Sequence, residues 1–523
     1  MKLILRFFGV LIKVSLGLLA IAIPLLGAWV GSSLAAFLNG PRWVAPLVAL
    51  LAFPIVPLLW DAWARRKRDK DAKSILTFVD RMTLRTLTLN VVFLGAFFFF
   101  SPKTVFTSMS ARGDWMLDDA GESSTVESIR DALFQTVDGL EWAFGGAVSD
   151  NAYEDLVEDD EAPPPPDLHE SIDERDASDV PEPQRPTPPP SRPDTPNTPH
   201  VPAPDTTDTP DTPNNPDAPE RPHAPSDDSA ADEAWPFEHT LHPAIASIPP
   251  SAESSITALA QYVTRSEDNK FQRVKALHDW VAEHVRYDVP LLRAIERGER
   301  PDFSSQQAEN VFRNRIGVCA GYANLMKALG EAASIDIEVV TGHTRQSVGG
   351  VGHAWNAVKI EERWYLMDAT WNAGHVEGDS FTPEYSTDYF LTPAGAFGRN
   401  HFPENPDWQL LAEPISRAEF MRLPNLRPSF FERGLALRSP NRSQVTVGGS
   451  FGVRIDNPQR QWVMVAYRPK SGGESVQCGI SNDAAVNANC PMVQSGFYTL
   501  HFLVGDQQYG QYQGVGEIEV VRR

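Results

Sequence analysis

The 523-residue sequence predicts a multidomain protein with transmembrane helices at the N-terminus, an α+β core and a C-terminal all-β sandwich. Three observations support this fold class. Long apolar stretches lie before residue 101, a proline-rich acidic segment follows, and the rest of the chain mixes helical and strand periodicities before showing strands alone. We therefore divide the chain into residues 1–110, 111–162, 163–237, 238–424 and 425–523.

Three apolar stretches predict transmembrane helices within residues 1–110. Residues 14–38 carry no charge and exceed the roughly 20 residues that a helix needs to cross a bilayer. Residues 43–60 are bounded by tryptophans, as at membrane interfaces, and residues 86–100 are the shortest candidate. The basic residues before the first span and between the second and third predict that both clusters are cytoplasmic.

The number of spans determines on which side of the membrane the chain after Ser101 lies. With three spans, everything after Ser101 lies outside the cytoplasm, which is the periplasm for a bacterial inner membrane; with two spans it lies inside. We expect a multi-pass inner-membrane protein with a periplasmic core, because the segment after the third span has few basic residues to retain it.

The acidity of the chain belongs to one segment. Between Asp114 and Trp235 there are 32 acidic and 5 basic residues, a balance of −27, whereas the whole chain has −22. The remainder is therefore about +5, so the overall field gives no reason to expect a nucleic-acid partner. Residues 111–162 are an acidic juxtamembrane segment. Residues 163–237 carry half of the 44 prolines and predict a disordered linker that cannot form a core.

The part after the linker begins as an α+β pattern. Apolar residues at helical spacing predict a helix over residues 270–287, and another begins at Cys319. Residues 336–341 read as a strand, and residues 353–370 as a hairpin that turns at Glu361 and Glu362.

Cys319 lies at the predicted start of a helix. The unpaired N–H groups and the dipole at that end favour an anion, and so favour the nucleophilic thiolate. A lone cysteine is also a common core residue, so its position alone does not establish a role in catalysis.

The hairpin places two further residues together. If it turns at Glu361 and Glu362, residues whose numbers sum to 723 face each other, and Trp355 opposes Asp368. His353 and Asp368 then share one sheet face as diagonal neighbours, roughly 7 to 8 Å apart between Cα atoms. A one-residue slip would separate them. This register predicts a site in which Cys319 is the nucleophile, His353 the base and Asp368 the residue that orients it.

Three blocks also resemble a known family. GVCAGYANLMKALGEA, GHAWNAVKI and RWYLMDATWNAG are similar to motifs of the transglutaminase-like superfamily, in the branch near the kyphoscoliosis-type peptidases. The resemblance spans residues 251–411. It implies a papain-like α+β core and acyl transfer or hydrolysis at peptide or glutamine amide bonds through a thioester on Cys319. It also implies that His353 is the general base and acid and that Asp368 orients it.

The neighbouring residues suggest the rest of the pocket. We expect Trp355, Tyr322 and Asn356 to line the substrate site, although a core role for Trp355 and Tyr322 is an equal alternative. The second oxyanion donor remains unassigned. No calcium-loop spacing is present, and Cys319, His353 and either His343 or His375 match no zinc pattern, so we expect no metal and no cofactor.

The C-terminal part alternates short apolar strands with turns, which predicts an immunoglobulin-like β-sandwich. Cys478 and Cys490 lie close together in sequence and predict a disulfide if the compartment is oxidising; two free thiols are the alternative. We expect a protein or peptide substrate, such as envelope proteins or cell-wall peptides. The rival hypothesis is an inactive transglutaminase-like scaffold of the cell envelope.

Overall fold

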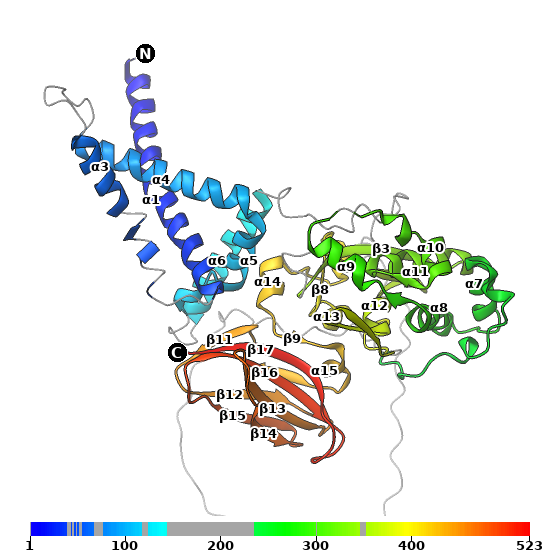
Figure 1. The fold of residues 1–523 in the computed structure, drawn as a ribbon. Coiled ribbons are helices and arrows are strands. Elements are labelled where there is room, and N and C mark those ends of the chain that lie inside the picture. The colour runs from blue at the N-terminus through cyan, green and yellow to red at the C-terminus, as the bar shows by residue number, and fades with distance from the viewer. Residues whose placement is uncertain are drawn as a thin grey trace, which may run out of the picture. The chain divides into compact units, whose positions relative to one another are not determined.

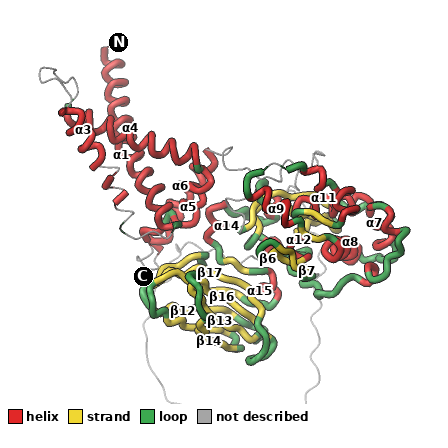
Figure 2. The backbone as a smooth tube through the Cα atoms, in the orientation of Figure 1, coloured by secondary structure: helices red, strands yellow, loops and turns green. Residues whose placement is uncertain are grey.

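The computed structural model describes residues 2–38, 43, 47–48, 50–51, 55–66, 77–117, 124–143, 235–299, 301–345 and 352–523 (Figure 1). The described residues form an N-terminal helical region, an α+β region after Trp235 and a β-rich C-terminal region, as Figure 2 shows by colour. Nearly all of the predicted linker, apart from its last three residues, lies outside the described residues.

The N-terminal region is helical. Its elements are α1 (Lys2–Phe37), α3 (Val56–Arg66), α4 (Phe78–Phe100), α5 (Pro102–Arg112), the 3-10 helix η2 (Trp115–Leu117) and α6 (Ser124–Ala143). Within the described residues, α4 is the one helix whose length and composition would let it cross a membrane, and Ile21–Phe37 of α1 is a shorter apolar helix. The third predicted span is therefore the best supported. Part of the second, residues 44–46, 49 and 52–54, lies outside the described residues, so a multi-pass arrangement stays a prediction.

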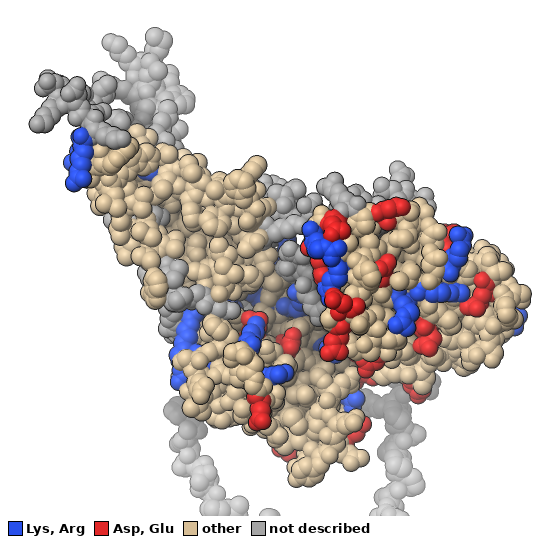
Figure 3. Space-filling view, viewed as in Figure 1, with Lys and Arg blue, Asp and Glu red and all other residues tan. Residues whose placement is uncertain are grey.

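Helix α4 begins eight residues before the predicted span, and local chemistry explains why. The Thr77 hydroxyl accepts the Asp80 N–H, while the Asp80 carboxylate accepts the Thr77 N–H. This reciprocal capping box satisfies two backbone donors at the helix start. On the face shown in Figure 3, charged side chains are sparse over this helical region, whereas acidic and basic side chains are interspersed over the α+β region.

The α+β region contains a four-stranded antiparallel sheet and surrounding helices. Its sheet has the strand order β5-β4-β3-β8, beside a parallel pair β1-β2 and a hairpin β6-β7. The strands are β1 (Arg286–Tyr287), β2 (Ile316–Gly317), β3 (Ile337–Thr344), β4 (His353–Ile360), β5 (Arg363–Met367), β6 (Gly374–Glu377), β7 (Ser380–Pro383) and β8 (His401–Pro403).

The helices of this region supply most of its core. They are α7 (Ile256–Thr264), α8 (Lys270–His284), α9 (Val289–Glu296), α10 (Ala308–Asn314), α11 (Cys319–Ala333), α12 (Ala369–Ala373), α13 (Ala394–Phe397) and α14 (Arg417–Arg422). Short 3-10 helices are η4 (Pro243–Ile245), η5 (Ala252–Ser254), η6 (Phe303–Gln306) and η7 (Pro406–Gln409). The predicted apolar stripes of α8 and α11 are buried in one cluster with parts of β3, β4 and β5.

The β4–β5 hairpin has the predicted register. Asn356 pairs with Met367 and Ile360 pairs with Arg363, and both pairs sum to 723. Glu361 and Glu362 both have positive φ, the backbone shape of a two-residue hairpin turn that matches the twist of its strands.

A buried polar cluster holds the start of this region. Lys275 and Asp279 form an ion pair one turn apart on α8. Asp279 also accepts hydrogen bonds from the backbone N–H of His242 and the hydroxyl of Tyr385, both at 2.7 Å. Just before the predicted start of the region at residue 238, Phe237 also packs against Phe390, with ring centroids 4.9 Å apart.

The C-terminal region is a two-sheet sandwich. One sheet has the order β10-β12-β15, and the other has β11-β17-β16-β13-β14 with β9 also paired to β17. The elements are β9 (Asn425–Leu426), α15 (Pro428–Glu432), β10 (Ala436–Ser439), β11 (Gln444–Val447), β12 (Ser450–Asp456), β13 (Trp462–Pro469), β14 (Val476–Ser481), β15 (Ala485–Pro491), β16 (Gly496–Gly505) and β17 (Gln513–Arg522).

Cys478 on β14 and Cys490 on β15 are joined by a disulfide, with their Cα atoms 4.6 Å apart. Because β14 and β15 belong to different sheets, this bond ties the two layers of the sandwich together at one edge.

Candidate active site

Cys319 is the first residue of α11 and is 1% exposed. The turn before it is made by Arg315, which has a φ of 57°, while Gly317 pairs in β2. No side chain caps this helix end from Val318, but the Gln306 side chain accepts the Val318 N–H at 2.8 Å. The helix start is thereby fixed from the preceding 3-10 helix.

Gly321 allows this close packing. A Cβ atom there would lie 2.5 Å from the side-chain oxygen of Gln306 and 2.9 Å from a methyl group of Val311. The glycine one turn into the helix is therefore required by the same amide that holds the cysteine turn.

Tyr287 also contacts the cysteine. Strands β1 and β2 pair in parallel with Tyr287 opposite Gly317, two residues before Cys319. The Tyr287 ring packs against the small apolar cluster that contains Cys319, and the Cys319 backbone N–H donates to the phenol oxygen. Burial raises the pKa of Tyr287, and the adjacent charge of Cys319 raises it further, so the phenol stays protonated.

His353 begins β4, where it pairs with Gly342 of β3, and is 6% exposed. Its Nε2 lies 2.7 Å from Oδ2 of Asp368, and its side chain also forms a hydrogen bond with the Cys319 side chain. Since Nε2 is occupied by the carboxylate, Nδ1 is the atom left for the sulfur. The imidazole therefore bridges the thiol and the carboxylate, as a nucleophile–base–carboxylate site requires.

Asp368 is fully buried and held on both sides. It is the N-cap of α12, where Oδ1 accepts the N–H groups of Thr370 and Trp371 at 2.9 and 3.2 Å. Its own N–H donates to the Tyr389 carbonyl at 2.8 Å. The capping role fixes the carboxylate plane, so that Oδ2 points at His353.

A third residue completes the cluster. His401, the first residue of β8, places Nε2 3.1 Å from the same Oδ2 atom of Asp368 and is 1% exposed. His401 follows Asp368 by 33 residues on a strand that reaches the site by pairing with β3, and no local spacing signals that contact.

These contacts set the charges. Burial alone would lower the pKa of His353, but the charges of Asp368 and Cys319 and the hydrogen bonds to both raise it to about 10. Burial would raise the pKa of Asp368, but the charge and hydrogen bond of His353, with the hydrogen bond of His401, hold it below its ordinary range. Burial lowers the pKa of His401 to about 4. At neutral pH, Asp368 is thus an anion, His353 a cation and His401 neutral.

The residues expected to line the pocket have core partners. The Tyr322 hydroxyl donates to the Val285 carbonyl at 2.6 Å, and the Asn356 amide donates to the carbonyls of Ala323 and Glu338. Trp355 is 1% exposed, with its ring centroid 6.0 Å from that of His353. Tyr322 and Asn356 join α8, α11 and the sheet, and their contact with substrate stays a prediction.

The two histidines and the carboxylate are residue types that bind metals. His353, Asp368 and His401 each offer one atom, all within 4.8 Å of one another, whereas the zinc set considered from sequence included His343 or His375. The nitrogen–oxygen distances of 2.7 and 3.1 Å are those of direct hydrogen bonds. The residues therefore fit a proton-handling cluster better than a metal centre.

The chain is similar to known proteins over the region that holds this site. Residues 257–369, which include all three predicted catalytic residues, match the Transglutaminase-like superfamily. The chain is 31% identical over 218 residues to "Kyphoscoliosis peptidase" of Homo sapiens and 30% identical over 218 residues to that of Mus musculus. Each match covers 40% of this chain and 32% of the relative.

"Hillarin" of Drosophila melanogaster is 30% identical over 135 residues, covering 22% of this chain and 16% of that protein. The chain therefore spans about a third or less of the length of these relatives.

Proposed function

We propose that this protein is a membrane-anchored cysteine enzyme acting on peptide or glutamine amide bonds, because residues 257–369 match the Transglutaminase-like superfamily. One observation carries the proposal: the His353 imidazole is hydrogen-bonded to the Asp368 carboxylate at 2.7 Å and to the Cys319 side chain.

The chemistry follows from these charges. The Cys319 sulfur, its proton held by His353, attacks the amide carbonyl carbon and forms a tetrahedral adduct. His353 then gives its proton to the leaving nitrogen, the C–N bond breaks and a thioester remains. Water or an amine attacks the thioester and loses a proton to His353, and the sulfur leaves. Asp368 stabilises the imidazolium and keeps the ring in place.

Tyr287 is our candidate for the second oxyanion donor. The backbone N–H of Cys319 is one donor, and in this structure it meets the Tyr287 oxygen. A substrate carbonyl that takes this position would accept the Cys319 N–H and the protonated Tyr287 hydroxyl together. Donors aimed at the developing negative charge stabilise the transition state.

Hydrolysis and transfer share this thioester, so one experiment should detect both. The full chain in detergent is incubated with glutaminyl peptides, with and without a primary amine, and the products are followed by mass spectrometry. We expect cleaved, deamidated or amine-linked peptide from the wild type and none from Cys319→Ala. Absence of every wild-type product, with normal folding, would favour the inactive scaffold instead.

We further propose that α4 crosses the membrane and that the enzyme faces an oxidising extracytoplasmic space, acting on envelope proteins or cell-wall peptides. The Cys478–Cys490 disulfide supports this location, since such bonds persist in oxidising compartments. An alkaline phosphatase fusion at Ala120 should be active. An inactive fusion would place the enzyme in the cytoplasm.

A further inference from the structure

The Asp368 carboxylate has more hydrogen-bond donors than the mechanism uses. Thr370 and Trp371 supply backbone N–H groups to Oδ1, and His353 reaches Oδ2. His401 reaches that same oxygen from another strand. A carboxylate needs one bond to orient a catalytic imidazole, so the fourth donor calls for a separate explanation.

The proton on His401 has a defined place. Among the described residues, Nε2 of His401 faces a charged acceptor at 3.1 Å, whereas Nδ1 forms no hydrogen bond of normal geometry and interacts only with the backbone carbonyl of Phe397. A hydrogen bond to the charged carboxylate is the stronger of the two. A neutral imidazole carries one N–H, and a carboxylate can only accept. His401 therefore donates from Nε2 to Asp368.

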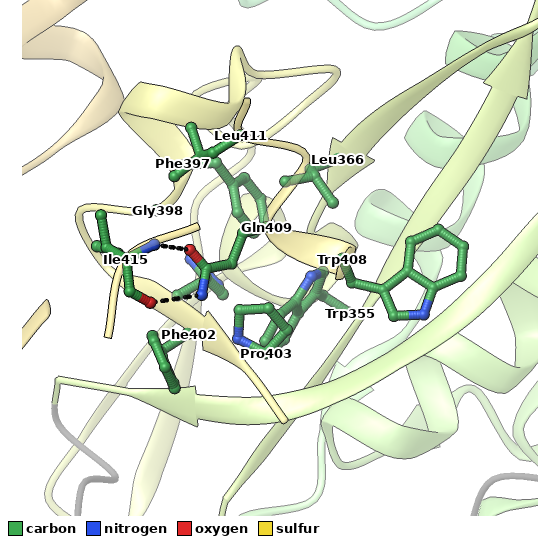
Figure 4. A pocket seen from close by; sticks show the side chains of 11 residues that line it. Trp355, Leu366, Phe397, Gly398, Phe402, Pro403, Trp408, Gln409, Leu411 and Ile415 are labelled. Atoms are coloured by element: carbon green, nitrogen blue, oxygen red, sulfur yellow. Dashed lines mark hydrogen bonds between the residues drawn. The ribbon is translucent and has the colours of Figure 1, made fainter. Parts of the chain in front are cut away.

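The ring cannot move away from this contact. Four aromatic rings surround it, with centroids 4.1 Å (Phe397), 4.6 Å (Trp371), 5.1 Å (Trp355) and 5.3 Å (Tyr389) from that of His401. The cavity that His401 lines with Trp355 and Phe397 is only about 10 Å³, about the space of a single water (Figure 4). The packing thus holds the donor in place before any substrate arrives.

The surrounding charges favour a neutral His401. The titratable groups that face His401 are Asp368, the His353 cation and the Tyr389 phenol. A charged His401 would compete with the His353 cation for the Asp368 carboxylate, and the two cations would repel each other. A neutral donor holds the carboxylate without adding a second cation.

We propose that His401 is a positioning residue of the catalytic centre, whose neutral Nε2–H holds Oδ2 of Asp368 ionised and aimed at His353. This inference rests on the proposed function. It assigns to β8, which follows the matched residues 257–369 in the chain, a part in setting the ionisation of Cys319 and His353.

The test uses iodoacetamide as the probe on the full chain in detergent, because Cys319 is the one free cysteine. The alkylation rate is measured against pH, which gives the pH of half-maximal rate. In His401→Leu, Asp368 loses the donor that aims it at His353, which weakens the ion pair that stabilises the thiolate. We expect the midpoint to rise by about 1 to 2 pH units, roughly the equivalent of one hydrogen bond to a charged group.

Two conservative variants separate positioning from packing. The amide of His401→Gln can reach the place of Nε2 and should keep the wild-type midpoint within about half a unit. The amide of His401→Asn reaches only the place of Nδ1 and should behave like the leucine variant. This pair carries the test if His401→Leu does not fold.

His278→Leu is the matched control, because His278 is equally buried and binds the buried Asp279 at 3.0 Å. It should lower the melting temperature and leave the midpoint unchanged. An unchanged midpoint in His401→Leu or His401→Asn would overturn the inference. A wild-type midpoint like that of free cysteine, unaffected by His353→Ala, would instead contradict the proposed function.

Discussion

The α+β region and the sandwich bury very different chemistry. Among the residues described between 235 and 424, which leave out 300 and 346–351, nineteen polar or charged residues are buried, including Lys275, Asp279 and Asp368. Within residues 425–523, all of which are described, the buried polar residues are Ser429 and Asn457. A buried charge is costly unless it is paired, so the first region carries many groups that an apolar core would omit.

The difference shows which region buries polar groups that serve the candidate site at a cost in fold stability. The sandwich needs only an apolar core and a disulfide to hold two sheets together. The α+β region instead holds a thiol, two histidines and a carboxylate in contact. Substitutions in one region should therefore alter its property, activity or stability, and leave the other region unchanged.

The largest expected effect is on activity. Cys319→Ala should abolish it, and His353→Ala should lower kcat by about 10² to 10⁴, the usual contribution of a positioned general base. Cys478→Ala with Cys490→Ala should leave kcat close to that of the wild type. A peptide-turnover assay measures all three. A comparable loss from the paired sandwich variants would contradict the division.

The next effect is on stability. Lys275→Met removes the cation from a buried pair and leaves Asp279 with less compensation, which should cost about 3–5 kcal/mol of unfolding free energy. Denaturant unfolding, followed by peptide-resolved hydrogen exchange, should locate the loss in the α+β region. The double variant Lys275→Met with Asp279→Leu should recover part of it.

Tyr287→Phe tests the oxyanion assignment. Removal of one such donor costs about 10² to 10³ in kcat, and KM should change little. Tyr322→Phe is the matched control, since its hydroxyl binds the Val285 carbonyl and should affect stability alone. A higher kcat in Tyr287→Phe would mean that the phenol blocks the site.

The smallest effect is on pH dependence. His353, whose pKa is raised to about 10, stabilises the fold fully below about pH 6.5 and loses this contribution as pH rises through 10. The pKa of His401 is lowered to about 4 in the folded state, so below about pH 6.5 the unfolded state binds a proton that the folded state does not. The free energy of unfolding therefore falls as pH drops from about 6.5 to 4. The lowered pKa of Asp368 extends this loss to more acidic pH.

Hydrogen exchange of the full chain at pH 5, 6.5 and 9 should therefore show the α+β region most protected near pH 6.5. The sandwich, which buries no histidine or carboxylate, should change less. Equal sensitivity of the two regions would contradict these assignments.

Cys319, His353 and Asp368 were predictable from the sequence because local geometry relates them. The turn at Glu361 and Glu362 determines the register that brings His353 near Asp368, and the helical pattern that begins at Cys319 places the thiol at a helix start. His401 and Tyr287 could not be found in this way. They reach the site through the pairing of β8 with β3 and of β1 with β2, which link distant segments.

The same limit applies to the pocket residues. Tyr322 and Asn356 lie near the catalytic residues in sequence, which suggested contact with substrate, but their hydrogen bonds are to backbone groups of α8, α11 and the sheet. Sequence neighbours on a strand point to opposite faces, so proximity along the chain does not decide which side a residue serves.

The most direct test of the central claim is the rate of Cys319 alkylation by iodoacetamide against pH, in the full chain and in His353→Ala. The account predicts a midpoint well below the value of about 8.5 for free cysteine, returning towards it in the variant. A midpoint near 8.5 in both proteins would contradict a His353-paired thiolate and favour a structural role for the helix start.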